Sequence, residues 1–341
     1  MYDRKTWQLC ISSGIFMTKP SSKSSKPKPL SGEAFSALVR DDGDDASAYL
    51  DTLEVESIID GTQTLVRWHR ICHDVTLDKP DTEKLLDKLF KLLIDFACTR
   101  KELADALASP VPGKPPSGQA FSALQEKARG LFTTSSTTGE VGELLLYFLA
   151  EHLLKYPQVL CKFSLKTNPN VHAHGADGVH ASVDPSTQHL RLHWGEAKLY
   201  QKLGNAVNDC CESLSELILQ PPGAKKSKKR DIELFRDFIK LENPALEMAI
   251  RAYLDPDKPL SNKVRFCGLA VIGFDLEDYD ALTKEVAQKE TTAIAARTAK
   301  WAKKFKKSVE DYKLTGITID AFCIPFPSVQ DFRDAFLKRL G

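Results

Sequence analysis

The chain has no segment that would place it in a membrane. No apolar run approaches the ~20 residues that cross a bilayer as a helix. The start, residues 1–19, has basic residues but only a broken apolar segment and no clean cleavage site, so it does not match a signal peptide. We therefore expect a cytoplasmic protein that makes no use of a membrane.

Paired cysteines are also missing. The eight cysteines are scattered, Cys210 and Cys211 are adjacent, and no Cys-x-x-Cys pair occurs. Unpaired cysteines suit a reducing compartment, and without thiolate pairs the histidines lack the spacing of a structural zinc site. The pattern thus agrees with a cytoplasmic location and indicates neither a disulfide scaffold nor a zinc finger.

Nucleotide-binding motifs and a strong net charge are absent as well. There is no Walker A sequence, no GxGxxG loop and no GxSxG nucleophile elbow. The formal net charge is only +1, so bulk electrostatics do not indicate a nucleic-acid binder. Two basic clusters, at 224–230 and 303–307, either contact phosphates or are solvated surface.

Composition divides the chain into three regions. Residues 1–32 end in a Pro/Ser/Lys-rich stretch that predicts a disordered tail. Residues 33–116 predict a small α+β region, with a hairpin around Asp60-Gly61 and one long amphipathic helix after Pro80. The Pro/Gly-rich loop at 109–118 marks the best boundary before the main domain, 117–341. The octapeptide SGEAFSAL at 31–38 recurs as SGQAFSAL at 117–124, and the sequence gives no reason for the repeat.

In the main domain, apolar strand-like segments alternate with helical ones. Strands are expected near 264–274 and 316–326, with helices at 199–220, at 279–311 and from Ser328 or Pro327 onward. This alternation predicts an α/β fold with a mixed central sheet flanked by helices on both faces.

The most informative segment is a predicted hairpin formed by residues 175–198. Alternation in an extended strand places Leu190, Leu192, Trp194, Glu196 and Lys198 on one face. A turn centred on residues 184–187 would set Val183 opposite Gln188 and Asp177 opposite Trp194. Asp177 would then lie diagonally beside Glu196, roughly 7 to 8 Å away at the backbone.

This arrangement suits hydrolysis of a phosphodiester. Two carboxylates, Asp177 and Glu196, would bind Mg²⁺, with Mn²⁺ as a plausible substitute, and the cation would activate water. Lys198, on the same face, would stabilise the developing negative charge. Glycines 175, 178 and 195 would let the substrate backbone approach, and His180 would either orient a site group or lie in the core.

A helix upstream offers further carboxylates. It should begin after an N-cap at Thr137 or Thr138 and end before Pro157. Glu140, Glu143, Tyr147 and Glu151 recur along it at three- and four-residue steps as one polar stripe. We expect Glu151 on the solvated side, and either Glu143, slightly favoured, or Glu140 as the third member of the metal site.

The order of these elements resembles the PD-(D/E)xK nuclease superfamily. A helix with glutamate precedes Asp177 on one strand and Glu196-Ala197-Lys198 on the next, although Ala176 stands where that motif has proline. More narrowly, GEVGELLLYFLAEHLL, KTNPNVHAHGADGVH, GEAKLY and FCIPFPSVQDFRDAF, from about residue 130 to 341, resemble the HamA family of the Hachiman antiphage system. That resemblance implies a restriction-endonuclease-like core, a role in antiviral defence and a helicase partner resembling HamB.

The sequence therefore predicts a magnesium-dependent DNA nuclease that a helicase-like partner controls and supplies. The residues leave two alternatives open. One is a non-catalytic interaction subunit that keeps the fold and regulates its partner, and the other is a nuclease of the same fold that cleaves RNA.

Overall fold

The fold is built on one large mixed β-sheet. The structure, a computed structural model, describes residues 30, 32–40, 43–108, 114–115, 117–132, 139–165, 176–219, 236, 239, 241 and 243–341. Seven strands form the sheet in the order β1 (Leu50–Ile58), β2 (Thr64–Ile71), β9 (Ile319–Phe326), β8 (Val264–Asp275), β7 (Leu190–Tyr200), β6 (Gly178–Val183), β5 (Gln158–Leu160). Strands β2, β9, β8 and β7 run parallel, and β1, β6 and β5 pair antiparallel at the two sides. A separate two-stranded ribbon joins β3 (His73–Asp74) and β4 (Lys79–Pro80).

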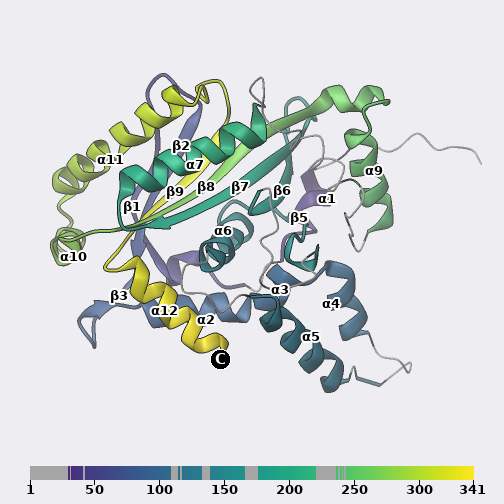
Figure 1. Ribbon diagram of the computed structural model, residues 1–341, viewed down its shortest axis with the longest axis horizontal. Helices are drawn as coiled ribbons and strands as arrows, with labels where there is room; N and C mark the ends of the chain where they lie inside the picture. Colours follow the sequence, from purple (N-terminus) through teal and green to yellow (C-terminus); the bar gives the residue numbers. More distant parts are fainter. Residues whose placement is uncertain are drawn as a thin grey trace, which may run out of the picture.

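Helices cover both faces of this sheet (Figure 1). One face carries α7 (Leu203–Ile218), α9 (Pro244–Leu254), α11 (Thr291–Asp311) and the short α1 (Gly32–Ser36), and α10 (Tyr279–Ala287) leads into α11. The other face carries α2 (Thr82–Lys91), α3 (Leu93–Ala97), α6 (Glu140–His152) and α12 (Val329–Leu340), with α4 (Arg100–Leu107) and α5 (Gly118–Gly130) packed outside α3. Three short 3₁₀ turns complete the set, at Ala46–Ala48, Phe163–Leu165 and Pro259–Lys263. The predicted mixed α/β architecture is confirmed.

Alternation along the central strands divides the core into two apolar layers. On β7, Leu192 and Trp194 face α7, whereas Ala197 and Leu199 face α6. All eight residues of β9 are buried, which is expected of a central strand covered on both faces. None of the described helices is long and apolar enough to span a membrane.

The main hairpin of the predicted α+β region at 33–116 joins the large sheet, and only the short β3–β4 ribbon stands apart from it. The hairpin, β1 and β2, turns at Asp60-Gly61 as expected, with Gly61 at a φ of 75°. However, β2 pairs in parallel with β9, Thr64 opposite Ile319, so the hairpin extends the sheet of the main domain. The loop at 109–118 therefore does not separate two independent sheets.

Three helix predictions need correction. The helix after Pro80 is divided into α2, α3 and α4. The break between α3 and α4 occurs because Cys98 is extended and Thr99 starts a new helix with a capping box to Glu102. The helix at 279–311 is divided into α10 and α11, between which Lys289 has a φ of 56°. The N-cap of α6 is Gly139 instead of a threonine.

Other local predictions are confirmed or fall outside the described residues. Ser328 caps α12, its Oγ accepting from the N–H of Asp331 at 3.1 Å. The two copies of the repeat begin α1 and α5 with the same bond, since Ser36 and Ser122 each donate to a glycine carbonyl four residues earlier at 3.1 Å. The predicted tail lies almost wholly outside the described residues, and the basic cluster at 224–230 lies entirely outside them.

Candidate active site

The hairpin that carries the motif forms, with a register two residues away from the prediction. Val183 pairs with Leu190, and the ladder continues to Gly178 opposite Gly195. The loop is longer than predicted because Asp184 Oδ1 accepts from the N–H groups of Ser186 and Thr187, and Gln188 has a φ of 56°. A shift of two residues leaves every side chain on its predicted face.

The ladder ends at Gly178 opposite Gly195, and Asp177 lies just before this pair, next to Gly195 and Ala197 of β7. The N–H of Asp177 donates to Gly195 O at 2.8 Å, and Asp177 Oδ2 accepts from the N–H of Ala197 at 2.8 Å. These two bonds, and the effect of the Asp177 charge on the pKa of Glu196, indicate that the two carboxylates are close neighbours. They lie where β6 begins and β7 continues past it.

Two lysines accompany the two carboxylates. Lys198 Nζ lies 2.5 Å from Glu196 Oε1, and Lys162 Nζ lies 3.8 Å from Asp177 Oδ1. The Lys198 side chain keeps 21% of its surface exposed and that of Asp177 15%, so the cluster is sunken but reachable. Lys162 was missed from the sequence because it follows β5 in a turn that no motif marks.

Burial and like charge shift the titration of these groups. Burial raises the pKa of Asp177 and outweighs the nearby Lys162 and the Ala197 N–H, which lower it. Burial and then the charge of Asp177 raise the pKa of Glu196 to about 7, despite Lys198. Burial lowers the pKa of Lys198, but Glu196 and Asp177 outweigh it, so the net pKa rises and the ammonium stays charged.

The upstream helix lies on the opposite face of β7. A Cβ on Gly142 of α6 would lie 3.3 Å from Ala197 Cβ and 3.2 Å from Leu199 Cγ, both on the face away from Glu196. Glu140 is 2% exposed, and Glu143 is partly exposed in the same first turn. To reach Asp177, either glutamate would have to pass the end of β6, and the choice between them stays a prediction.

Two glycines have a packing role that the sequence did not indicate. A Cβ on Gly195 would come within 2.9 Å of Leu146 Cδ2, and one on Gly178 within 3.7 Å of the same atom. Both residues admit α6 close to the sheet, and this face is the one away from the carboxylates. Gly175 lies outside the described residues.

The far end of α6 corrects the prediction for Glu151. This residue is fully buried rather than solvated: it accepts from the N–H of Arg40 at 3.0 Å and of Gln158 at 2.7 Å, and Arg100 lies 3.4 Å away. His180 is likewise a core residue, with its Nδ1 2.8 Å from Tyr156 O on the α6 face. Sequence periodicity places polar residues on one face of a helix, but it does not show whether solvent or protein covers that face.

Two of the residues present, Asp177 and Glu196, are suited to bind one hard divalent cation. Asp177 and Glu196 offer oxygen ligands on one face, and their mutual repulsion, seen in the raised pKa of Glu196, is what a bound cation would relieve. Within the part of the chain that the structure describes, no three His, Cys, Asp or Glu side chains are grouped closely enough to hold a metal. The remaining ligands would come from water, substrate phosphate or a rotated glutamate of α6.

Comparison with known proteins identifies the family. A search of curated proteins gave no match. The family model named HamA matches residues 47–340, so the match begins before β1 and extends into α12. The match thus includes the N-terminal hairpin, in agreement with the single sheet, and associates the chain with antiphage defence. The chain belongs to the HamA family.

Proposed function

We propose that this protein is a metal-dependent DNA nuclease that acts in antiphage defence. The observation that carries the proposal is the position of Asp177 beside Glu196. The N–H of Asp177 donates to Gly195 O, its Oδ2 accepts from the N–H of Ala197, and Lys198 is ion-paired to Glu196. Two carboxylates and a charged lysine in a half-buried position form a set suited to phosphodiester hydrolysis.

Each residue has a distinct task in this proposal. Asp177 and Glu196 would hold Mg²⁺, which supplies an activated water and neutralises phosphoryl charge when bound. The hydrogen bond from the Ala197 N–H fixes Asp177 Oδ2, which leaves Oδ1 facing Lys162 and the site. Lys198, which is a charged ammonium ion-paired to Glu196, would donate to a phosphoryl oxygen when Glu196 is bound to the cation.

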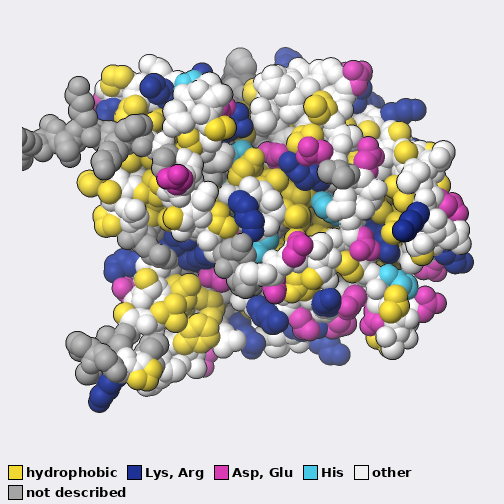
Figure 2. Space-filling view, turned by 180° about the vertical axis from the view of Figure 1, so that it is seen from behind, with side chains coloured by type: hydrophobic (Ala, Val, Ile, Leu, Met, Phe, Trp, Pro, Cys, Tyr) yellow, Lys and Arg dark blue, Asp and Glu magenta, His cyan; other side chains and the backbone are white. Residues whose placement is uncertain are grey.

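The proposal includes control by a helicase partner, which the resemblance to the HamA family implies and with which the charge of the surface is compatible. Basic and acidic side chains are interspersed on the face shown in Figure 2, and the net charge is +1. A surface of mixed sign provides little long-range attraction for DNA. A motor that delivers the strand would compensate for this weak intrinsic attraction.

The metal requirement can be tested on the complex of the chain with its helicase partner. Chelation with EDTA should abolish cleavage of plasmid and linear DNA, Mg²⁺ or Mn²⁺ should restore it, and Ca²⁺ should bind without turnover. Equal cleavage in excess EDTA would contradict the assignment of the metal.

Two near-isosteric variants separate an enzyme from a regulatory subunit. Asp177→Asn and Glu196→Gln change charge at the site and keep shape, so they should preserve the complex with the helicase partner. Both should lose DNA degradation and phage protection together if hydrolysis is the function. Full protection by either variant would instead establish a non-catalytic interaction subunit.

A further inference from the structure

An open cavity adjoins the candidate active site where β7 ends. Its volume is about 490 Å³, and its lining includes Tyr200, Lys202, Asn205, Gln330 and Arg333. These residues come from three elements: the end of β7, the first turn of α7 and the first turns of α12. The cavity therefore lies at the edge of the sheet where the parallel strands end, a common position for ligands in α/β proteins.

Two cations, Lys202 and Arg333, line this cavity. Lys202 and Arg333 form no ion pair among the described residues, and Arg333 Nε is buried without a hydrogen-bond partner there. Burial lowers the pKa of Arg333 and outweighs Tyr200, Asp275 and Asp334. Arg333 Nη2 donates to Leu199 O. The remaining donors of this partly desolvated arginine, which forms no ion pair among the described residues, are suited to bind an anion from outside.

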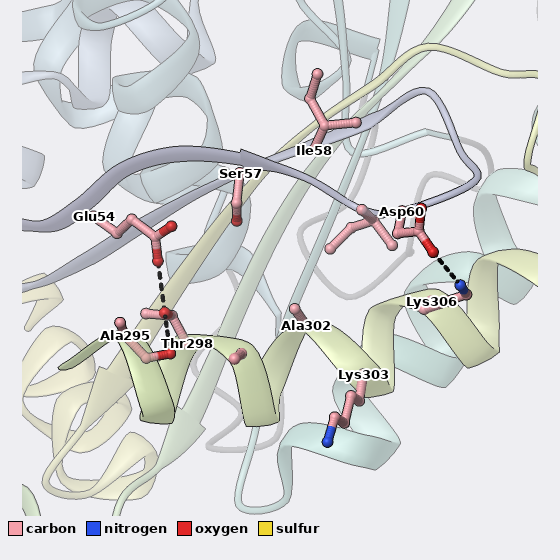
Figure 3. A pocket seen from close by; sticks show the side chains of 11 residues that line it. Glu54, Ser57, Ile58, Asp60, Ala295, Thr298, Ala302, Lys303 and Lys306 are labelled. Carbon is pink, nitrogen blue, oxygen red and sulfur yellow. Dashed lines mark hydrogen bonds and ion pairs between the residues drawn. The ribbon is translucent and has the colours of Figure 1, made fainter. Parts of the chain in front are cut away.

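A third cation comes from the basic cluster at 303–307. A Cβ on Gly204, in the first turn of α7, would lie 3.6 Å from Lys304 Nζ, so α11 brings this ammonium to the start of α7. The neighbouring Lys306 is engaged elsewhere: it pairs with Asp60 at 2.7 Å across the groove between β1 and α11 (Figure 3). Of this cluster, Lys306 therefore forms a structural ion pair, and Lys304 lies near the cavity.

Tyr200 lines the cavity and lies two residues beyond Lys198 at the end of β7. This residue lies on the same face of β7 as Glu196 and Lys198, and its hydroxyl interacts with Asp209 of α7. From Lys198 to Lys202 an extended chain covers at most ~13 Å, at ~3.3 Å per residue. One DNA strand rises ~3.4 Å per nucleotide, so this span corresponds to about four nucleotides.

We propose that this cavity binds a backbone phosphate of the same DNA strand, within about four nucleotides of the bond that Asp177, Glu196 and Lys198 act on. Arg333 and Lys202 make the charged contacts, Asn205 and Gln330 the neutral ones, and Lys304 adds positive charge at the margin. The inference rests on the proposed nuclease function and assigns the cavity the task of holding the strand in register. Contacts to phosphate position a strand without reading its sequence.

The test measures DNA binding separately from cleavage. The full-length chain carrying Glu196→Gln is titrated with a short fluorescein-labelled duplex and the matching single strand, over a series of KCl concentrations, by fluorescence anisotropy. Lys202→Ala and Arg333→Gln should each weaken binding and reduce the slope of log affinity against log salt by about 1. Lys263→Ala, an exposed lysine where β8 begins, is the matched control and should leave the slope unchanged.

The outcomes distinguish this inference from the proposed function. Unchanged slopes in both Lys202→Ala and Arg333→Gln, or no measurable binding at low salt, overturn the phosphate site even if the wild-type chain cleaves DNA. Reduced slopes support the phosphate site even if cleavage is absent, in which case the nuclease proposal fails alone. Because Lys202 is exposed, its variant remains informative if Arg333→Gln lowers the unfolding temperature.

Discussion

Two buried glutamates, Glu151 and Glu196, illustrate how similar burial can serve different ends. Burial raises the pKa of both carboxyl groups. Glu151 accepts hydrogen bonds from two backbone N–H groups and lies 3.4 Å from Arg100, so these groups together balance its negative charge. Glu196 faces the like charge of Asp177 and has Lys198 as its nearest cation. A raised pKa alone therefore does not distinguish the two glutamates, whereas the sign of the neighbouring charge does.

The largest expected effect concerns Glu151, whose charge is balanced by two backbone N–H groups and by Arg100. Glu151→Ala removes the buried carboxylate that lies 3.4 Å from Arg100 and accepts from two backbone N–H groups, so the free energy of unfolding should fall by about 3 to 5 kcal/mol. Urea denaturation followed by circular dichroism measures this. Glu196→Gln is the control and should unfold at wild-type or higher urea, since it removes repulsion with Asp177. Equal losses in both variants would abolish the contrast between the two sites.

The next effect concerns catalysis and Lys198, the cation nearest to Glu196. Lys198→Ala should lower the rate of DNA cleavage by at least ~10², because it removes the cation that faces developing negative charge. Lys198→Arg should not restore the rate, since the planar guanidinium presents its donors at different angles. Both are measured as single-turnover rates with a plasmid substrate. Wild-type turnover in the alanine variant would move the catalytic centre elsewhere.

A smaller effect comes from two histidines paired across β6 and β7 on the α6 face. Burial lowers the pKa of His180 to about 4, and burial together with His180 and Arg191 lowers that of His193 to about 3. The unfolded chain binds more protons below the ordinary pKa of 6.5, so stability should fall as pH falls from 6.5 toward 4. At pH ~5.5 the loss is roughly 1.4 kcal/mol per histidine.

Chemical denaturation at pH 7.5 and pH 5.5 measures this loss. The variant His193→Gln should show a smaller difference between the two pH values than the wild-type chain, since one titrating group is gone. An unchanged difference would mean that other groups dominate the acid sensitivity.

The smallest expected effect is stabilisation by the cation. At a Mg²⁺ concentration of about five times its Kd, the free energy of unfolding should rise by about 1 kcal/mol. Asp177→Asn and Glu196→Gln should lose this gain, whereas Glu151→Gln should retain it, because only the first two remove a proposed ligand. Differential scanning fluorimetry with and without Mg²⁺ makes the comparison, and an equal gain in Glu196→Gln would exclude that residue as a ligand.

The sequence was most informative where periodicity fixes a face. Strict alternation from Leu190 to Lys198 set Glu196 and Lys198 on one side, and this survived the two-residue error in register because the error was even. The register itself depends on the hydrogen bonds of Asp184 and the positive φ of Gln188, which local patterns do not determine.

Partners that come from distant parts of the chain could not be predicted in this way. Lys162 reaches Asp177 from the turn after β5, and Arg100 reaches Glu151 from α4, 51 positions away. The cavity at the end of β7 likewise needs α12, which only the parallel pairing of β8 and β9 brings near. Such contacts depend on tertiary packing, which local sequence patterns do not determine.

The position of β9 has a consequence for how the protein is made. This fully buried strand lies between β2 and β8, yet it follows all other strands in the sequence. Until it emerges from the ribosome, β2 and β8 each present an unpaired edge, and the sheet consists of two separate pieces. Pairing between segments some 250 positions apart also slows folding. The complete sheet therefore assembles only after the last strand has been translated, so the incomplete chain cannot reach the native fold.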